Sequence, residues 1–150
     1  MHILIDGDGC PVVALTIRVA REFGAACTIF CDTSHVYDLR GAETVVCDQG
    51  ADSVDYKLAN RIAPGDLAIT QDYGLAAMCL SRGAAAISQN GLRYADDNIG
   101  GLLEVRAFSG RVRRSGGRLK GPSKRTAMQD RAFEAALRRM LEEAYAGRNS

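Results

Sequence analysis

The sequence predicts an α/β fold in which a mostly parallel, five-stranded sheet carries helices on both faces and a helix at the C-terminus. Three observations support this prediction. Short apolar, β-branched runs alternate with longer segments whose apolar residues recur every three or four positions, as in βαβ units. Gly and Pro residues stand between these segments. The last segment has a helical composition with a single apolar stripe.

The first part of the chain predicts a strand, a helix and a second strand. The continuous apolar run Ile3-Leu4-Ile5 indicates a buried strand over residues 2–6. The glycines and the proline after it force a turn, and residues 12–23 then have the apolar spacing of a helix. Another apolar run indicates the second strand, over residues 26–31.

The middle of the chain repeats this alternation. A third strand over residues 43–47 leads into a helix in which every fourth residue is apolar, and a Pro-Gly pair ends that helix. A fourth strand over residues 67–70 opens into a helix from about residue 74 to residue 82. A glycine breaks this helix, and residues 84–88 then predict a fifth strand. Strands joined in this way by helices are expected to be parallel.

The pattern changes after residue 94. A short helix is expected near residues 97–108, followed over residues 109–126 by a mobile basic loop that is rich in Gly, Arg and Ser. Residues 127–145 predict the C-terminal helix, which we expect to pack against the body of the protein. Its apolar stripe consists of Phe133, Leu137 and Leu141.

Composition places the chain among ordinary globular proteins. With 150 residues, 47% of them apolar, it can bury one core, so we expect residues 1–150 to form a single domain. No apolar run approaches the roughly 18 residues that span a bilayer, and no secretory leader is recognisable. These features predict a cytoplasmic protein without a membrane partner. The five cysteines contain no C-x-x-C pair, which argues against a zinc or thioredoxin-like site.

The net charge of +1 hides an asymmetry along the chain. Residues 1–100 contain seven basic and thirteen acidic residues, a net charge of −6, whereas residues 101–150 contain twelve and five, a net charge of +7. An acidic body with a basic tail suits a polyanionic partner, because the tail can hold phosphates while the acids hold a cation. A solvated basic helix surface is the alternative interpretation.

Two carboxylates stand at the carboxyl end of the first strand, in the segment Asp6-Gly7-Asp8-Gly9. In open α/β sheets the carboxyl ends of the strands are where ligands bind. The two acids are therefore better placed for chemistry than two acids on an arbitrary surface loop. Because they face each other across a tight turn and repel, they predict a functional site.

Further acids fall at positions that a parallel sheet brings to the same edge. Asp52 and Asp55 open the second helix, and Asp72 follows the fourth strand. If the first strand lies beside the fourth, these acids converge with Asp6 and Asp8. Two carboxylates about 5 Å apart repel by roughly 3 kcal/mol at an effective dielectric near 20, so such a cluster needs compensating charge. An all-oxygen site suits Mg²⁺ or Mn²⁺, which we expect as the cofactor.

Some of these residues also have structural interpretations. Asp52 and Asp55 suit helix capping, and Asp72 suits the N-cap of the helix that follows it. Cys10 is expected to pack under the turn, because nearby negative charge raises the pKa of a thiol and weakens it as a nucleophile. His35 lies in a polar loop, where a lone histidine is seldom a ligand.

Four ordered motifs, spread over essentially the whole chain, resemble the YaiI/YqxD family of bacterial proteins. The motifs are residues 6–11 (DGDGCP), 50–55 (GADSVD), 65–76 (GDLAITQDYGLA), and Lys120-Gly121-Pro122 with Asp130-Arg131. That family is grouped with PIN-like domains. The resemblance therefore implies a PIN-like three-layer sandwich with a metal-dependent, RNA-cleaving ancestry, and it implies no demonstrated activity.

The PIN-like pattern of acids can be carried over position by position. It falls on Asp6, on Asp52 or Asp55, and on Asp72, while Asp8 would be this family's own addition. These five acids are the predicted metal ligands.

Positions that depart from the acidic pattern are candidates for substrate contact. Where many PIN nucleases have a second acid, this chain has Thr70, whose hydroxyl suits a phosphate or a metal-held water but lacks the charge. Lys120, Lys124 and Arg125 are candidates for phosphate contact by their charge.

The leading functional hypothesis is a divalent-metal-dependent ribonuclease in which Asp6, Asp8 and Asp72 are catalytic and the basic tail holds the RNA backbone. With no Trp and 6% aromatic residues, platforms for base stacking are sparse, so weak base specificity is expected. Two alternatives remain open. An Asp-x-Asp motif after the first strand also begins haloacid-dehalogenase-like phosphatases, in which Asp6 would be the nucleophile. The same site can also serve a protein that binds RNA without cleaving it.

Overall fold

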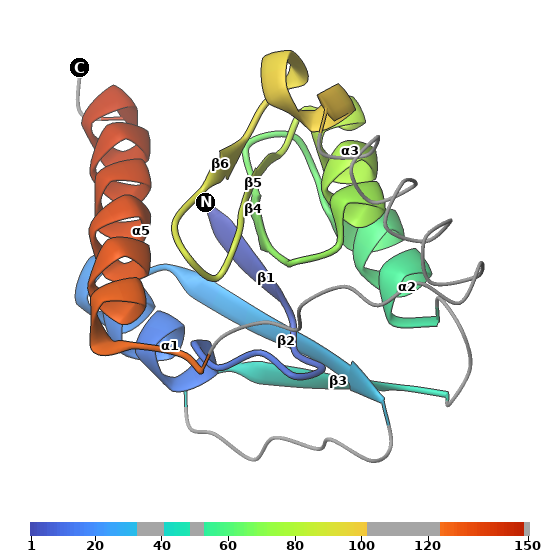
Figure 1. Cartoon of the computed structure of the whole chain (residues 1–150), viewed down its shortest axis with the longest axis horizontal. Coiled ribbons are helices and arrows are strands. Elements are labelled where there is room, and N and C mark those ends of the chain that lie inside the picture. Colours follow the sequence, from blue (N-terminus) through green and yellow to red (C-terminus); the bar gives the residue numbers. More distant parts are fainter. Residues whose placement is uncertain (33–40, 49–52, 102–123, 149–150) are drawn as a thin grey trace.

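The computed structural model describes residues 1–32, 41–48, 53–101 and 124–148. Its centre is a six-stranded sheet with the order β3-β2-β1-β4-β5-β6 (Figure 1). The strands are β1 (His2–Asp6), β2 (Ala26–Asp32), β3 (Glu43–Cys47), β4 (Leu67–Ile69), β5 (Ala85–Ile87) and β6 (Arg93–Tyr94). The first five are parallel, as predicted, and β1 and β4 lie side by side at the centre of the sheet.

The prediction of five strands was wrong by one, because β6 adds an antiparallel edge next to β5. Only Arg93 and Tyr94 form this strand, which is too short to show an alternating pattern in the sequence. The turn that leads into it contains Gly91 at a φ of 87°, in the left-handed region that favours glycine. A Cβ atom at Gly91 would lie 2.7 Å from the carbonyl oxygen of Ala132 in the C-terminal helix. The turn and that helix therefore pack backbone against backbone.

Helices cover both faces of the sheet, which gives the three layers of the predicted architecture (Figure 1). One face carries α1 (Val13–Phe23) and α5 (Ala127–Arg148), and the other carries α2 (Ser53–Arg61) and α3 (Tyr73–Ser81). Residues 96–101 are also helical and correspond to the start of the helix expected near residues 97–108. The rest of that helix and residues 109–123 of the predicted basic loop lie outside the described residues.

Alternation along the central strand creates a separate core on each face. Ile3 and Ile5 of β1 point toward α1 and α5, whereas Leu4 between them points toward α2 and α3. All three are fully buried. A strand buried on both faces reads as the continuous apolar run from which it was predicted.

The C-terminal helix docks on α1 through its predicted apolar stripe. Phe133, Leu137 and Leu141 have no exposed surface. At the rim, Arg138 forms two hydrogen bonds to Glu22, with N–O distances of 2.6 and 3.2 Å. None of the helices in the described residues is both long enough and apolar enough to cross a membrane.

Candidate active site

A cleft opens at the carboxyl ends of the two central strands, where the sequence places its acidic residues. It has a volume of about 180 Å³. Residues from the turn after β1 and from the ends of β4 and β5 line it: Asp6, Asp8, Gly9, Cys10, Ile69, Thr70, Gln71 and Gln89. The parallel register, with Ile5 beside Ile69, sets Asp6 next to Thr70.

Asp6 is the last residue of β1 and is mostly buried. Burial is the main cause that raises the pKa of its carboxyl group to about 6, and the charges of Asp8 and Asp72 act in the same direction. Two hydrogen bonds oppose this effect, one from the hydroxyl of Thr70 and one from the backbone N–H of Asp8. A carboxyl group with a raised pKa at the edge of a cleft is a candidate functional group.

The turn after β1 presents Asp8 at the mouth of the cleft. A hydrogen bond of 2.8 Å from Gly7 N to Phe30 O in β2 fixes the backbone of this turn. Gly9 has a φ of 67°, which lets the chain reverse tightly. The Oδ1 atom of Asp8 accepts a hydrogen bond of 3.2 Å from the backbone N–H of Asp32. The carboxylate is exposed but held at a defined place beside β2.

Thr70 and Asp72 form a relay of hydrogen bonds that ends on Asp6. The N–H of Asp72 donates to Thr70 Oγ1 at 3.0 Å, and Thr70 Oγ1 donates to Asp6 Oδ2 at 2.8 Å. Thr70 is buried, and its hydroxyl proton is directed at Asp6. In this structure the side chain predicted to bind substrate orients the neighbouring carboxylate.

Asp72 occupies the N-cap of α3, which was one of its two predicted roles. Its Oδ1 accepts hydrogen bonds from Gly74 N at 2.8 Å and from Leu75 N at 3.1 Å. The carboxylate nevertheless contributes to the electrostatics of the cleft, since its charge raises the pKa of Asp6. A capping role and an electrostatic role are compatible at this position.

The second helix contributes less to this cleft than the sequence predicts. Asp52 lies outside the described residues. Asp55 is in the first turn of α2, does not line the cleft, and acts electrostatically on Cys79 in α3. Across the described part of the chain, no three His, Cys, Asp or Glu side chains are grouped so as to hold a metal ion. Asp6 and Asp8 thus line the cleft together, and Asp72 acts on Asp6 through its charge without lining the cleft, whereas Asp55 does neither.

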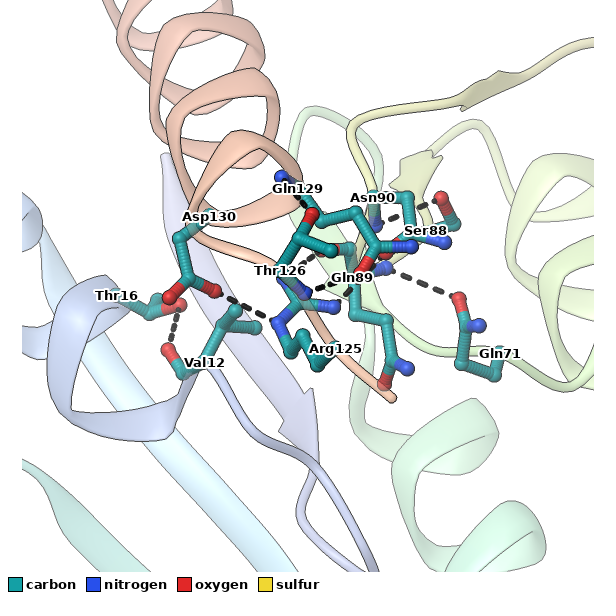
Figure 2. Close-up of polar contacts among 10 residues, drawn as sticks. All are labelled: Val12, Thr16, Gln71, Ser88, Gln89, Asn90, Arg125, Thr126, Gln129 and Asp130. Carbon is teal, nitrogen blue, oxygen red and sulfur yellow. Dashed lines mark hydrogen bonds and ion pairs between the residues drawn. The ribbon is translucent and has the colours of Figure 1, made fainter. Parts of the chain in front are cut away.

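The basic candidates differ in their surroundings. Lys120 lies outside the described residues, and Lys124 is exposed just before α5. The guanidinium of Arg125 forms three short contacts (Figure 2), to Asp130 Oδ1 at 2.7 Å, to Asn90 Oδ1 at 2.8 Å and to Gln89 O at 2.7 Å. Arg125 therefore braces the loop after β5, a role that its charge alone does not reveal.

Cys10 lines the cleft as a half-buried thiol. Burial raises the pKa of this thiol to about 11, and the negative charge of Asp6 adds to the effect. The sequence predicted that the pKa of Cys10 is raised, but it named the nearby negative charge, whereas burial is the larger cause. A thiol with this pKa is protonated at neutral pH and is a poor nucleophile. His35 lies outside the described residues.

The sequence analysis missed the two glutamines of the cleft, Gln71 and Gln89. A short repeat marks them: the chain reads Ala-Ile-Thr-Gln-Asp over residues 68–72 and Ala-Ile-Ser-Gln-Asn over residues 86–90. The two copies are in register on neighbouring strands, with Ala68 beside Ala86. Each glutamine therefore stands two residues beyond its strand at the same edge of the sheet. This repeat was the available signal.

Comparison with known proteins gives a consistent result at the level of sequence. A model of the family described as "Uncharacterized BCR, YaiI/YqxD family" matches residues 4–143. A UPF0178 protein of Exiguobacterium sibiricum is 50% identical over 143 residues, 95% of this chain and 98% of the relative. A UPF0178 protein of Clostridium acetobutylicum is 43% identical, over 94% of this chain and 97% of the relative.

Among solved structures, the similarity lies in the fold and extends over the whole chain. A crystal structure of a mutant of Rae1 (YacP) from Bacillus subtilis aligns with 98% of this chain and 99% of that chain. The identity is 15% and the TM-score is 0.43. The grouping of this chain with known proteins therefore rests on its sequence.

Proposed function

The chain belongs to the YaiI/YqxD family, and we propose that it is a divalent-metal-dependent nuclease that hydrolyses phosphodiester bonds in RNA. One observation carries this proposal. A mostly buried carboxylate, Asp6, ends the central strand near two further acids, Asp8 and Asp72. Burial is the main cause that raises its pKa to about 6, and the charges of the two acids act in the same direction. A cation at this point would offset the mutual repulsion of the three groups.

The donor chemistry of the cleft suits Mg²⁺ or Mn²⁺. These ions prefer oxygen ligands, and Mg²⁺ usually binds through one or two carboxylates while it keeps several waters and accepts a substrate phosphate. Asp6 and Asp8 are the residues that would hold the ion. When bound, it would neutralise charge on the phosphodiester and lower the pKa of a water molecule.

The side chains of the protein itself fill the other roles in this proposal. Thr70 fixes one carboxylate oxygen of Asp6 through its hydroxyl and so orients this group at the cleft. Above a pH of about 6, Asp6 is ionised in the metal-free protein and is able to serve as an oxygen ligand. Asp72 keeps α3 capped while its charge favours positive charge near Asp6. The basic tail, with Lys124, would contact the RNA backbone.

The direct test is cleavage of a labelled single-stranded RNA in the presence of Mn²⁺. Asp8→Asn and Asp72→Asn each remove one negative charge, and Asn retains the oxygen that accepts the observed hydrogen bonds. Each is expected to reduce the rate by about 100-fold or more, in the range typical of lost acid–base or electrostatic catalysis. Asp97→Asn, at an exposed acid outside the cleft, is the matched control and should cleave at the wild-type rate.

Cleavage that survives both Asp8→Asn and Asp72→Asn would indicate a contaminating nuclease and would overturn the proposal. RNA binding without cleavage by the wild type would instead support a binding protein. A covalent-like adduct of beryllofluoride with Asp6 would support the phosphatase.

Metal binding is tested separately by thermal unfolding. A ligand at 100 times its Kd adds about 2.7 kcal/mol to the free energy of unfolding, which for a chain of this size raises Tm by roughly 5 to 10 °C. We expect such a rise with Mn²⁺ or Mg²⁺ and a smaller one in Asp6→Asn. An equal rise in Asp6→Asn and the wild type would place the ion elsewhere.

A further inference from the structure

The backbone of Gln89, in the loop after β5, is held from two sides. Its N–H donates a hydrogen bond of 3.0 Å to the side-chain oxygen Oε1 of Gln71, which follows β4. Its carbonyl oxygen accepts a hydrogen bond of 2.7 Å from Nη2 of Arg125, which precedes α5. Figure 2 shows these contacts converging on this residue from separate elements. Both polar groups of its backbone are thus fixed by distant side chains.

The side chain of Gln89 is used differently. It lines the cleft and is half-buried there. Asp6, Thr70 and Gln71 each form hydrogen bonds at the cleft. Within the described residues, the carboxamide of Gln89 forms none, and no dashed line reaches it in Figure 2. The protein therefore immobilises the residue and presents its carboxamide to whatever enters the cleft.

We propose that Gln89 is a specificity residue that reads an adenine base beside the scissile phosphodiester. This inference deepens the proposed function and rests on it. A carboxamide places one acceptor and one donor side by side, which matches the N6 amino group and N7 of adenine in a bidentate pair. On the same edge guanine offers two acceptors and each pyrimidine offers a single polar group. Phosphate, by contrast, is matched by the forked donors of Arg or the charge of Lys.

The two hydrogen bonds that fix the backbone of Gln89 increase the affinity that such a contact contributes. A side chain on a fixed backbone loses less conformational freedom when a ligand binds than one on a mobile loop. Single-stranded RNA exposes its base edges, so hydrogen bonds of this kind can select among bases without an aromatic platform. Gln89 thus replaces the weak base specificity expected from composition with a preference for adenine.

The experiment measures binding without cleavage. Four fluorescein-labelled RNA pentamers, which differ only in the central base in a uridine context, are titrated in EDTA and followed by fluorescence anisotropy. The wild type is expected to bind the adenine pentamer about 5- to 100-fold more tightly than the others, the range of one good bidentate pair. Gln89→Leu should bind all four alike.

Replacement of the carboxamide by a carboxylate gives the sharper test. Gln89→Glu offers two acceptors and no donor, so it loses the bidentate pair with the N6 amino group and N7 of adenine, and the preference for adenine should disappear. Gln129→Glu is the matched control, because it makes the same exchange on α5 and keeps the oxygen that accepts from Thr126 N. It should retain the preference for adenine. The side chain of Gln89 holds no other group, so its variants should unfold within about 2 °C of the wild type.

The outcomes separate this inference from the proposed function. Equal binding of the four pentamers by the wild type, or a preference for adenine that survives in Gln89→Leu, overturns the role of Gln89. Cleavage with Mn²⁺ is then measured on the same pentamers. Adenine-selective binding without any cleavage supports Gln89 as a base reader and overturns the nuclease, whereas cleavage without base preference does the reverse.

Discussion

The loops after β4 and β5 begin with nearly the same sequence, yet the protein uses them differently. After β4, the hydroxyl of Thr70 reaches across to β1 and donates to Asp6. After β5, the hydroxyl of Ser88 stays within its own loop and accepts hydrogen bonds from Asn90 N at 3.2 Å and Leu92 N at 3.1 Å. The first loop continues into α3, whereas the second turns back into the antiparallel strand β6.

The difference comes from the neighbours of each loop. β4 pairs with a central strand that ends in an acid, so the hydroxyl of Thr70 has a carboxylate to orient. β5 is followed by Asn90-Gly91, which closes a turn. The glutamines also divide their work: the side chain of Gln71 holds the backbone of Gln89, and Gln89 presents its own side chain to the cleft. Similar sequences thus orient the carboxylate of Asp6 and support the neighbouring loop in one copy, and present a carboxamide to the cleft in the other.

The largest expected effect concerns Asp6, the acid that the loop after β4 contacts through Thr70. Burial raises the pKa of Asp6 from 3.8 to about 6 in the folded protein, so its stabilising contribution is fully present below pH 3.8 and is lost as pH rises through 6. Asp6→Asn removes this loss, and the metal-free variant should be more stable than the wild type at pH 7.5 by up to about 3 kcal/mol. Urea unfolding at pH 4 and at pH 7.5 measures the difference. An Asp6→Asn advantage that is the same at both pH values would contradict the assigned pKa.

The next effect compares the two hydroxyls directly. Thr70→Val and Ser88→Ala each leave backbone N–H groups without their side-chain acceptor, so both should lower the free energy of unfolding by about 1 to 3 kcal/mol. Only Thr70→Val should also raise the pKa of Asp6 above 6, because the hydrogen bond from Thr70 lowers it. Carboxyl ¹³C chemical shifts followed by NMR give that pKa. Thr70→Ser, which keeps the hydroxyl, should restore the wild-type pKa of Asp6. An unchanged pKa in Thr70→Val would show that the hydroxyl of Thr70 does not act on Asp6.

The smallest effect concerns the brace of the second loop. Arg125→Lys keeps the charge but loses the planar fork that contacts Asp130, Asn90 and Gln89, and it should cost about 1 kcal/mol of stability. Its clearer consequence is on Gln89, whose preference for adenine should weaken. Arg131→Lys, at an exposed position in the first part of α5, serves as the control. A variant at Arg125 that keeps full base preference would show that the brace does not position Gln89.

Sequence reasoning predicted the parts of the molecule that have strong local patterns. Buried parallel strands appear as continuous apolar runs, and their carboxyl ends mark a shared edge, so the meeting of Asp6 and Asp72 followed from the strand order. β6 has two residues and shows no pattern. The role of Arg125 depends on Asn90 and Gln89, about 35 positions away in sequence, and its charge gave no sign of these partners. The glutamines carry no charge and were detectable only through the repeat.

The close packing of the turn at Gly91 against Ala132 has a consequence for biosynthesis. One wall of the cleft is complete only when the last helix is in place, because Arg125 and the first turns of that helix hold the loop of Gln89. Domains generally fold as units while the ribosome delivers them from the N-terminus. The loop of Gln89 therefore stays without its brace until α5 has been synthesised and has docked on the body of the protein.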